Sequence, residues 1–260
     1  MRLELPRLRR LRLALEEPFP DEWRRILERR WGLWATFATE DQARLEDLIK
    51  VFIADKRWEA ARGFTVTDEI RVLIAAQACL LILELDHDYY RHSGSIIVHP
   101  TTMVLTGERL VGAGGIVADG PFPILGQAQH RGPIVIAWDA AASGARHPER
   151  GHNVVFHEFA HKLDMLDGTV DGTPPLRDDA TRNEWIAVCT REYRALRAGL
   201  GGYVLDDYGA VNPGEFFAVA TEVFFSRAVA LREEKPELYG VLSGFYRQDP
   251  AARVAPYEAR

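Results

Sequence analysis

The middle of the chain reads Val154-Val155-Phe156-His157-Glu158-Phe159-Ala160-His161-Lys162-Leu163-Asp164. In a helix, side chains four positions apart lie one above the other on the same face. His157 and His161 can therefore direct two imidazoles at one point, as a zinc ion requires of its first two ligands. Glu158 is rotated from His157 by about 100° around the helix axis, beside the metal rather than on it. A zinc-bound water loses a proton near neutral pH, and a carboxylate in this position can accept it. The pattern predicts a hydrolytic zinc site.

The residues around the two histidines disfavour the alternative, a surface helix with two unrelated imidazoles. The segment is apolar nearly all round, which predicts a buried helix, and buried polar groups without partners are costly. We expect this helix to begin near Asn153, whose side chain can act as N-cap, and to end at Gly168. Asp164 shares the face of His161. It either orients a ligand from behind or is a solvated residue in the last turn.

A second apolar segment offers the third ligand. Asn212 and Pro213 are typical of an N-cap and the first residue of a helix. Glu215 and Glu222, seven positions apart, share a face of that helix. Glu215 also has the position of the acid in a capping box. Because a buried carboxylate must be protonated or find a donor or cation, we take Glu215 as the third ligand. Glu222 is then a supporting carboxylate or the alternative ligand.

Composition narrows the class of protein. With 260 residues, of which 47% are hydrophobic and 27% charged, the chain is typical of a soluble globular protein. A net charge of −6 argues against a dedicated nucleic-acid binder. The longest apolar run, residues 72–85, is interrupted by Gln77 and too short to cross a bilayer. The N-terminus has no apolar core of a signal peptide. We therefore expect a cytoplasmic protein without a membrane anchor.

Three regions are expected along the chain. Residues 1–20 alternate leucine with arginine and predict a flexible N-terminal arm, or else an arm that binds a partner. Residues 21–93 show helical periodicity, most clearly at 40–56 and 67–85. Residues 94–260 form the catalytic region and can pack as one domain with 21–93. They begin with short β-branched segments at 95–99 and 102–105. A glycine- and proline-rich segment at 112–126, expected to be loop, and a strand at 132–139 follow.

Two motifs resemble the Mlc titration factor A family of bacterial zinc peptidases. They are residues 151–164 and 212–219, and the likeness extends to residues 74–81 and 132–135. It covers most of the chain from about residue 20, without the N-terminal arm and the last ten or so residues. The resemblance implies a gluzincin-type site similar to the catalytic domain of anthrax lethal factor. It also implies peptide cleavage, often of the aminopeptidase kind, and binding of the glucose-responsive repressor Mlc.

The resemblance assigns roles to five residues. It implies that His157, His161 and Glu215 hold Zn²⁺ and that Glu158 is the general base. Tyr208 matches the tyrosine that the family has seven residues before its ligand glutamate. Its phenol O–H would donate to the oxyanion of a tetrahedral intermediate. An ordinary loop tyrosine is the alternative.

We therefore predict an α+β fold, a mainly helical zincin-like metallopeptidase with a small mixed sheet packed on the metal-binding helix. Its expected partners are a peptide or protein substrate and an Mlc-like transcriptional repressor, with no direct contact to nucleic acid or membrane. The main alternative is a regulatory protein that sequesters a repressor and has latent or secondary peptidase activity. The leucine/arginine arm favours it, because a simple peptidase does not need one. A purely structural zinc is disfavoured, because such sites usually have four protein ligands rich in cysteine.

Overall fold

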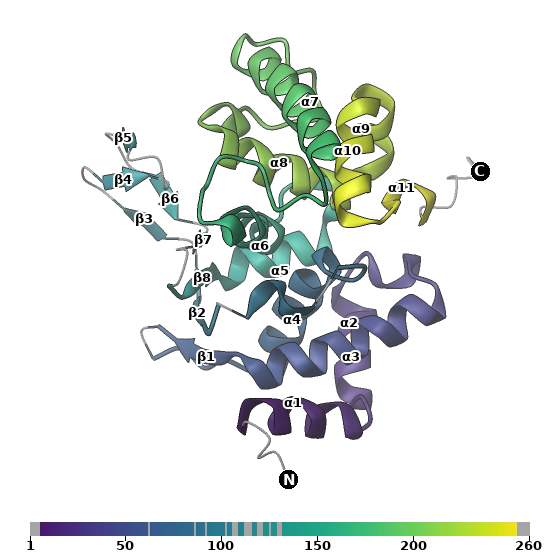
Figure 1. Ribbon diagram of the computed structural model, residues 1–260. Coiled ribbons are helices and arrows are strands. Elements are labelled where there is room, and N and C mark those ends of the chain that lie inside the picture. The colour runs from purple at the N-terminus through teal and green to yellow at the C-terminus, as the bar shows by residue number, and fades with distance from the viewer. Residues whose placement is uncertain are drawn as a thin grey trace, which may run out of the picture.

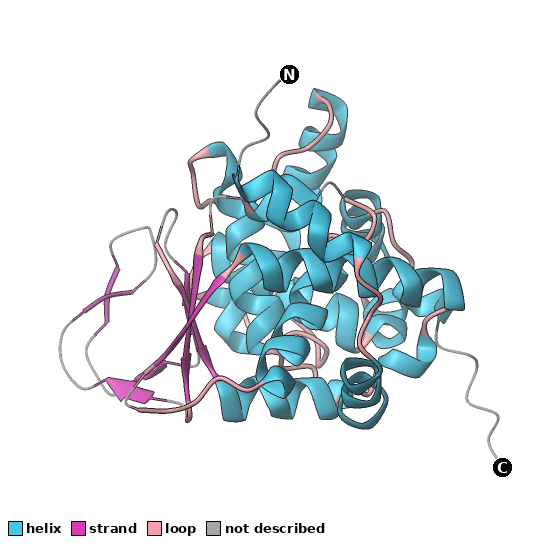
Figure 2. Ribbon diagram, turned by 90° about the horizontal axis from the view of Figure 1, so that it is seen from below, coloured by secondary structure: helices cyan, strands magenta, loops and turns pink. Residues whose placement is uncertain are grey.

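The computed structural model describes residues 6–253 except 62, 86, 92, 102, 106–108, 112–115, 119–121, 125 and 129–131. Helices make up most of it, and a small sheet lies along one side of the helical body (Figure 1, Figure 2). Within the described residues, no helix is both long enough and apolar enough to cross a membrane. The predicted fold class, mainly helical with a small mixed sheet, is confirmed.

The described residues between 6 and 90 contain four α-helices and two short 3₁₀ helices. They are α1 (Pro6–Glu16), α2 (Asp21–Arg30), η1 (Trp34–Thr36), α3 (Thr39–Asp55), α4 (Asp68–Leu81) and η2 (His87–Tyr90). Helix α4 starts at Thr67, whose hydroxyl accepts a hydrogen bond from the Ile70 amide. All its residues from Val72 to Leu81 are buried, as the unbroken apolar pattern predicts.

The arm expected at residues 1–20 is helical from Pro6 to Glu16. Helix α1 packs on α3 and buries Leu11 there. The guanidinium of Arg7 lies 2.6 Å from the carboxylate of Asp55, and the Lys50 ammonium donates to the Glu17 carbonyl at 2.8 Å. These contacts tie the helix to the body, although Leu8, Leu13 and Leu15 are each about half exposed. The division of the chain at residues 20 and 93 stays a prediction.

The main sheet has the strand order β1-β2-β8-β7. Strands β1 (Arg57–Ala60), β2 (Ser95–His99) and β8 (Ile134–Ala137) are parallel, and β7 (Gly126–Ala128) is antiparallel to β8. Ile96 pairs with Ile134 and Val98 with Ile136, and all four side chains are buried. Because successive side chains in a strand alternate between faces, this sheet presents one apolar face. Strands β7 and β8 pack against helix α6 (Val154–Asp164), which carries His157 and His161.

Two further strand pairs precede β7. Strand β3 (Met103–Leu105) pairs with β6 (Phe122–Ile124), and β4 (Arg109–Val111) pairs with β5 (Ile116–Ala118). Strands β5 and β6 lie inside residues 112–126, so the expectation of a loop is wrong for those two strands. Backbone hydrogen bonds alone define such short antiparallel pairs, and glycine or proline nearby does not prevent them.

The rest of the chain is helical. It comprises α5 (Trp138–Arg146), η3 (Pro148–Arg150), α6 (Val154–Asp164), η4 (Met165–Asp167), α7 (Asp179–Arg197), η5 (Asp207–Ala210), α8 (Pro213–Ser226), α9 (Ala228–Glu234), α10 (Pro236–Tyr246) and α11 (Pro250–Arg253). Helix α6 is the centre of the fold, because it packs against α4, α5 and α8.

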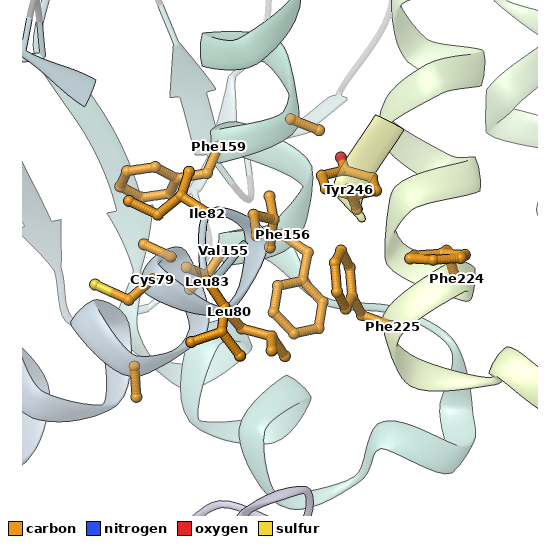
Figure 3. Packing of buried hydrophobic residues seen from close by; sticks show 14 of the residues in the cluster. Cys79, Leu80, Ile82, Leu83, Val155, Phe156, Phe159, Phe224, Phe225 and Tyr246 are labelled. Atoms are coloured by element: carbon orange, nitrogen blue, oxygen red, sulfur yellow. The ribbon is translucent and has the colours of Figure 1, made fainter. Parts of the chain in front are cut away.

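Aromatic side chains fill the space between α6 and its neighbours. Figure 3 shows Phe156 of α6 facing Phe225 of α8, with their ring centroids 5.5 Å apart, and Tyr246 beside Phe225 at 4.9 Å. Phe159, three residues further along α6, packs edge-on against Tyr90 at 4.8 Å. The helix that carries the histidines is thus fixed within the hydrophobic core.

Candidate metal centre

Asn153 starts helix α6, as the sequence predicts. Its side-chain oxygen accepts hydrogen bonds from the amides of Val155 and Phe156 at 3.1 and 3.0 Å. After α6, the 3₁₀ turn η4 ends at Gly168, which has the left-handed conformation with φ 96°. Such a residue is a common end for a helix, because glycine adopts positive φ without steric cost.

Helix α8 also begins where the sequence predicts. The Asn212 side chain accepts a hydrogen bond from the Glu215 amide at 3.0 Å, and Pro213 is the first helical residue. This cap fixes the first turn of α8, from which Glu215 extends toward α6. The Glu215 side chain is buried and contacts both His157 and His161.

The three residues bring three potential ligand atoms together. The Nε2 atom of His157 lies 3.0 Å from Oε2 of Glu215, and the Nε2 atoms of His157 and His161 are 3.2 Å apart. His161 Nε2 is 3.3 Å from the same Glu215 oxygen. Three ligands at about 2.0 to 2.1 Å from a tetrahedral zinc ion are about 3.3 Å from one another. The donor set therefore has the size of one face of a zinc tetrahedron, and it fits a metal ion.

The carboxylate and the imidazoles of this group provide a favourable position for a cation. Burial opposes ionisation of Glu215, but hydrogen bonds to His157 and His161 outweigh burial and lower its pKa well below the ordinary value. Burial also opposes a charge on His157, yet its bonds to Glu215 and Glu222 raise the imidazole pKa well above the usual value. Both shifts have one cause: carboxylates and imidazoles that share a small buried space stabilise positive charge between them.

A buried network of hydrogen bonds fixes the Nδ1 side of His157. Its Nδ1 donates to Oε1 of Glu222 at 2.8 Å, and the other Glu222 oxygen accepts from the Asn153 amide. The Asn153 side-chain amide donates to Gln77 Oε1 at 2.8 Å, and Gln77 in turn donates to the Leu73 carbonyl. A carboxylate behind a ligating histidine fixes its tautomer and ring orientation. Glu222 thus lies on the side of His157 that faces away from Glu215.

Sequence reasoning did not find the contribution of Gln77 and Asn153 to this network. Gln77 is the one amide in the apolar run of α4, and it is fully buried. A polar residue inside a buried helix needs a partner, so this exception to the pattern was the available signal. The identity of the partner, 76 residues away at Asn153, could not be deduced from it.

Glu158 and Asp164 are also buried. Burial raises the pKa of Glu158, and its Oε2 has no hydrogen-bond partner in the described part of the chain. Asp164 accepts a hydrogen bond from the Gly172 amide at 3.0 Å, and burial raises its pKa to about 6. The alternative of a solvated Asp164 is therefore wrong. Its Oδ1 and the Nδ1 of His161 both lack a partner among the described residues.

Tyr208 lies at the exposed side of the centre. It belongs to η5, which Asp206 caps by accepting a hydrogen bond from the Tyr208 amide at 2.8 Å. The phenol ring lies 6.0 Å from the imidazole of His157, centroid to centroid, and the residue is 42% exposed. Burial of part of the ring and the neighbouring Glu215 raise the phenol pKa, so the hydroxyl keeps its proton and can donate it in a hydrogen bond.

Comparison with known families identifies the group to which this arrangement belongs. The sequence model of the family described as glucose-regulated metallo-peptidase M90 matches residues 5–247. This chain belongs to the M90 metallopeptidase family. The matched residues contain the whole His-His-Glu group. The fold and the family together therefore show an M90 metallopeptidase with a group of residues that can hold a metal ion.

Individual relatives are similar to this chain over most of their length. An uncharacterised protein of Synechocystis sp. is 35% identical over 240 residues, which are 90% of this chain and 86% of the relative. The Mlc titration factor A of Edwardsiella ictaluri is 34% identical over 228 residues, 85% of this chain and 86% of that protein. The protein of the same name in Yersinia pestis is 31% identical over 231 residues, 87% and 84% of the two chains.

Proposed function

We propose that this M90 protein is a zinc-dependent peptidase that hydrolyses peptide bonds. The convergence of two imidazole nitrogens and one carboxylate oxygen, within 3.3 Å of one another, carries the proposal. Two histidines and one glutamate are the ligands of catalytic zinc in several peptidases, where three protein ligands leave a fourth position open. In such a site, zinc polarises a carbonyl and makes a water molecule acidic near neutral pH.

Glu158 is the general base in this proposal. It follows His157 directly in α6, so its carboxylate lies next to the ligands without being one of them. It takes the proton of the attacking water and later returns it to the leaving amine. Burial raises its pKa, and a group with a pKa nearer to neutral accepts and donates a proton more readily at working pH. Tyr208 donates its O–H to the oxyanion that forms at the substrate carbonyl.

The substitution Glu158→Gln tests this proposal. It preserves the shape of the side chain and removes its basicity, so peptide hydrolysis should fall by at least about a hundredfold. Metal content should stay near that of the parent, since Glu158 is not a ligand. Glu184→Gln, an exposed change on α7, is the matched control and should keep full activity. If Glu158→Gln cleaves peptides as fast as the parent, the mechanism is wrong.

The position of the cleaved bond is a further part of the proposal. The family resemblance supports an aminopeptidase, which requires a free amino group at the start of its substrate. Acetylation of that amino group should then prevent cleavage of an otherwise identical peptide. Equal cleavage of both peptides would support an endopeptidase instead.

A second candidate function is binding of an Mlc-like transcriptional repressor, with peptidase activity latent or secondary. Two relatives that are 34% and 31% identical carry the name Mlc titration factor A, and such a partner would place this protein in the cytoplasm. The half-exposed leucines of α1 offer an apolar surface for it. Capture of the repressor by the parent but not by a Leu8→Ser/Leu13→Ser variant would support this surface. Equal capture by both would exclude it.

A further inference from the structure

A hollow of about 270 Å³ lies beside the metal centre. Its wall consists of residues 150–152 before α6, residues 202–207 before and at the start of η5, and one face of α8 from Val219 to Arg227. Glu222 connects the hollow with the metal centre, because it lines the hollow and also accepts the hydrogen bond from His157 Nδ1. A molecule in the hollow would therefore lie next to the carboxylate that orients the His157 imidazole.

Two arginines line this wall, Arg150 and Arg227, and Arg227 is the one that is half-buried. It lies at the end of α8, and its guanidinium has no hydrogen bond or ion pair with any residue that the structure describes. The acids next to it are engaged. Glu222 accepts from His157 and from the Asn153 amide, while Asp206 caps η5 and Asp207 is exposed to solvent. A half-buried arginine is normally paired, because removing a charge from water is costly.

Gly151 makes room for the Arg227 side chain. Its φ of +79° is a conformation that glycine adopts easily. A Cβ atom at this position would lie 3.0 Å from Cδ of Arg227, closer than such atoms normally approach. The aliphatic part of Arg227 therefore rests on the bare backbone of Gly151. This contact holds the guanidinium at the wall of the hollow, where a ligand can reach it.

We propose that this hollow is a subsite for a carboxylate of the peptide substrate and that Arg227 is the residue that selects it. The inference rests on the proposed peptidase function and adds the class of substrate. A guanidinium can form two parallel hydrogen bonds with a carboxylate, which gives both affinity and orientation.

The position of Arg227 along α8 indicates where the carboxylate lies in the substrate. Arg227 follows the candidate ligand Glu215 by twelve residues, which is about 18 Å along the helix axis. An extended peptide advances about 3.3 to 3.6 Å per residue. The selected carboxylate is therefore about five residues from the bond that is cleaved, as an aspartate or glutamate side chain or as the free C-terminus of a short peptide.

Binding measurements with matched peptides test this subsite. The zinc-loaded Glu158→Gln protein is titrated by calorimetry, so that no peptide is consumed, with peptides that differ only by aspartate or asparagine at each position. The same peptides with a free or an amidated C-terminus form the second arm. We expect one carboxylate to tighten binding at least about tenfold, as a charged hydrogen bond does. Arg227→Gln should remove this preference and Arg227→Lys should keep part of it.

Arg182, an exposed arginine on α7 outside the hollow, provides the control. Arg182→Gln should keep the full preference. If Arg227→Gln also keeps it, or if the Glu158→Gln protein with Arg227 intact shows none, the inference is overturned. Cleavage by the enzyme with an intact Glu158 separates the two proposals: a preference in binding without hydrolysis of any peptide supports the subsite and contradicts the peptidase function. Loss of the preference on amidation assigns the C-terminus, and loss on replacing aspartate by asparagine assigns a side chain.

Discussion

His157 is held at both of its nitrogens. Nε2 faces Glu215 and His161, while Nδ1 donates to Glu222. The Glu222 carboxylate has two acceptor oxygens, and each is used: one by His157 and one by the Asn153 amide. In an amide, an NH₂ group replaces one of these oxygens and would face one of the two donors, which it cannot accept.

Glu222→Gln should therefore weaken metal binding without removing a ligand. We expect the affinity for Zn²⁺ to fall by about ten- to a hundredfold, the usual effect of losing a partner behind a ligating histidine. Competition with a chromophoric chelator measures this change. Glu233→Gln, an exposed change on α9, should leave the affinity unaltered. An affinity equal to that of the parent in Glu222→Gln would show that the carboxylate does not orient the imidazole.

Metal binding should also depend on pH. The pKa of His157 is raised well above its usual value, since bonds to Glu215 and Glu222 outweigh the effect of burial. A metal ion must displace that proton before it can bind Nε2. Between about pH 6 and pH 8, affinity should therefore rise with pH, and binding should release a proton. Calorimetry in buffers of different ionisation enthalpy measures the released proton. No proton release in this range would contradict the raised pKa.

The spacing of residues predicts the individual residues of the candidate centre better than it predicts the residues that support them. His157, Glu158 and His161 follow from a four-residue spacing within one helix, and Glu215 follows from a capped helix with few polar residues. The partner of Gln77 could not be predicted in this way. Its hydrogen bond to Asn153 joins two helices that are far apart in sequence, and periodicity contains no information on which buried amides meet.

Asn153 joins three helices. It caps α6, donates to Gln77 of α4 and supplies the amide that Glu222 of α8 accepts. Asn153→Ala removes both the cap, worth about 1 kcal/mol, and the partner of buried Gln77, worth about 1 to 3 kcal/mol. We expect the free energy of unfolding to fall by about 2 to 4 kcal/mol, measured by urea denaturation.

Asp178 provides the matched control for that change. It caps α7 by accepting a hydrogen bond from the Thr181 amide at 2.8 Å, but it is exposed. Asp178→Ala should therefore cost only about 1 kcal/mol. Equal losses in the two variants would mean that the bond to Gln77 contributes nothing to stability.

The loop between η4 and α7 is fixed at Gly172. Its amide donates to Asp164, its carbonyl accepts from the Trp185 indole, and a Cβ here would overlap the Pro213 carbonyl. Gly172→Ala should destabilise the protein by several kcal/mol, because it adds this clash to the strain of positive φ. Gly168→Ala has the same kind of strain at φ +96°, but open space around it, and should cost about 1 kcal/mol. Similar melting temperatures for both variants would contradict this account.

Helix ends were more predictable than strands. Asn153, Gly168 and Asn212 mark boundaries through local hydrogen bonds, which depend on the residue type itself. Strand β1 has an exposed, charged sequence without alternation, so only its parallel pairing with β2, 38 residues away at Arg57 and Ser95, defines it. The order of strands in the sheet depends on such distant pairings and does not follow from local pattern.

Metal binding should stabilise the whole chain, since its three ligands come from two helices that pack side by side in the core. A ligand that binds only the folded state at a hundred times its dissociation constant adds about 2.7 kcal/mol to the free energy of unfolding. Addition of Zn²⁺ should raise the melting temperature of the parent and leave that of His161→Ala nearly unchanged. An equal shift in both proteins would indicate that Zn²⁺ binds elsewhere.

The fold class of the molecule could be predicted from its sequence, because two long motifs and the apolar pattern of α4, α6 and α8 all indicate buried helices around a zinc site. The way these helices enclose the centre could not, since α6 packs against α4 and α8, which are distant in sequence, and contacts α8 through aromatic side chains. The boundaries at residues 20 and 93 stay predictions.

The separation of the ligands along the chain has a consequence for biosynthesis. Glu215 follows His157 by 58 residues, so a ribosome that adds about 5 to 20 residues per second makes it roughly 3 to 12 seconds later. During that interval the nascent chain has both imidazoles but not the carboxylate beside them. Selection of the correct cation is thus a late event, which takes place once α8 has left the exit tunnel and docked on α6.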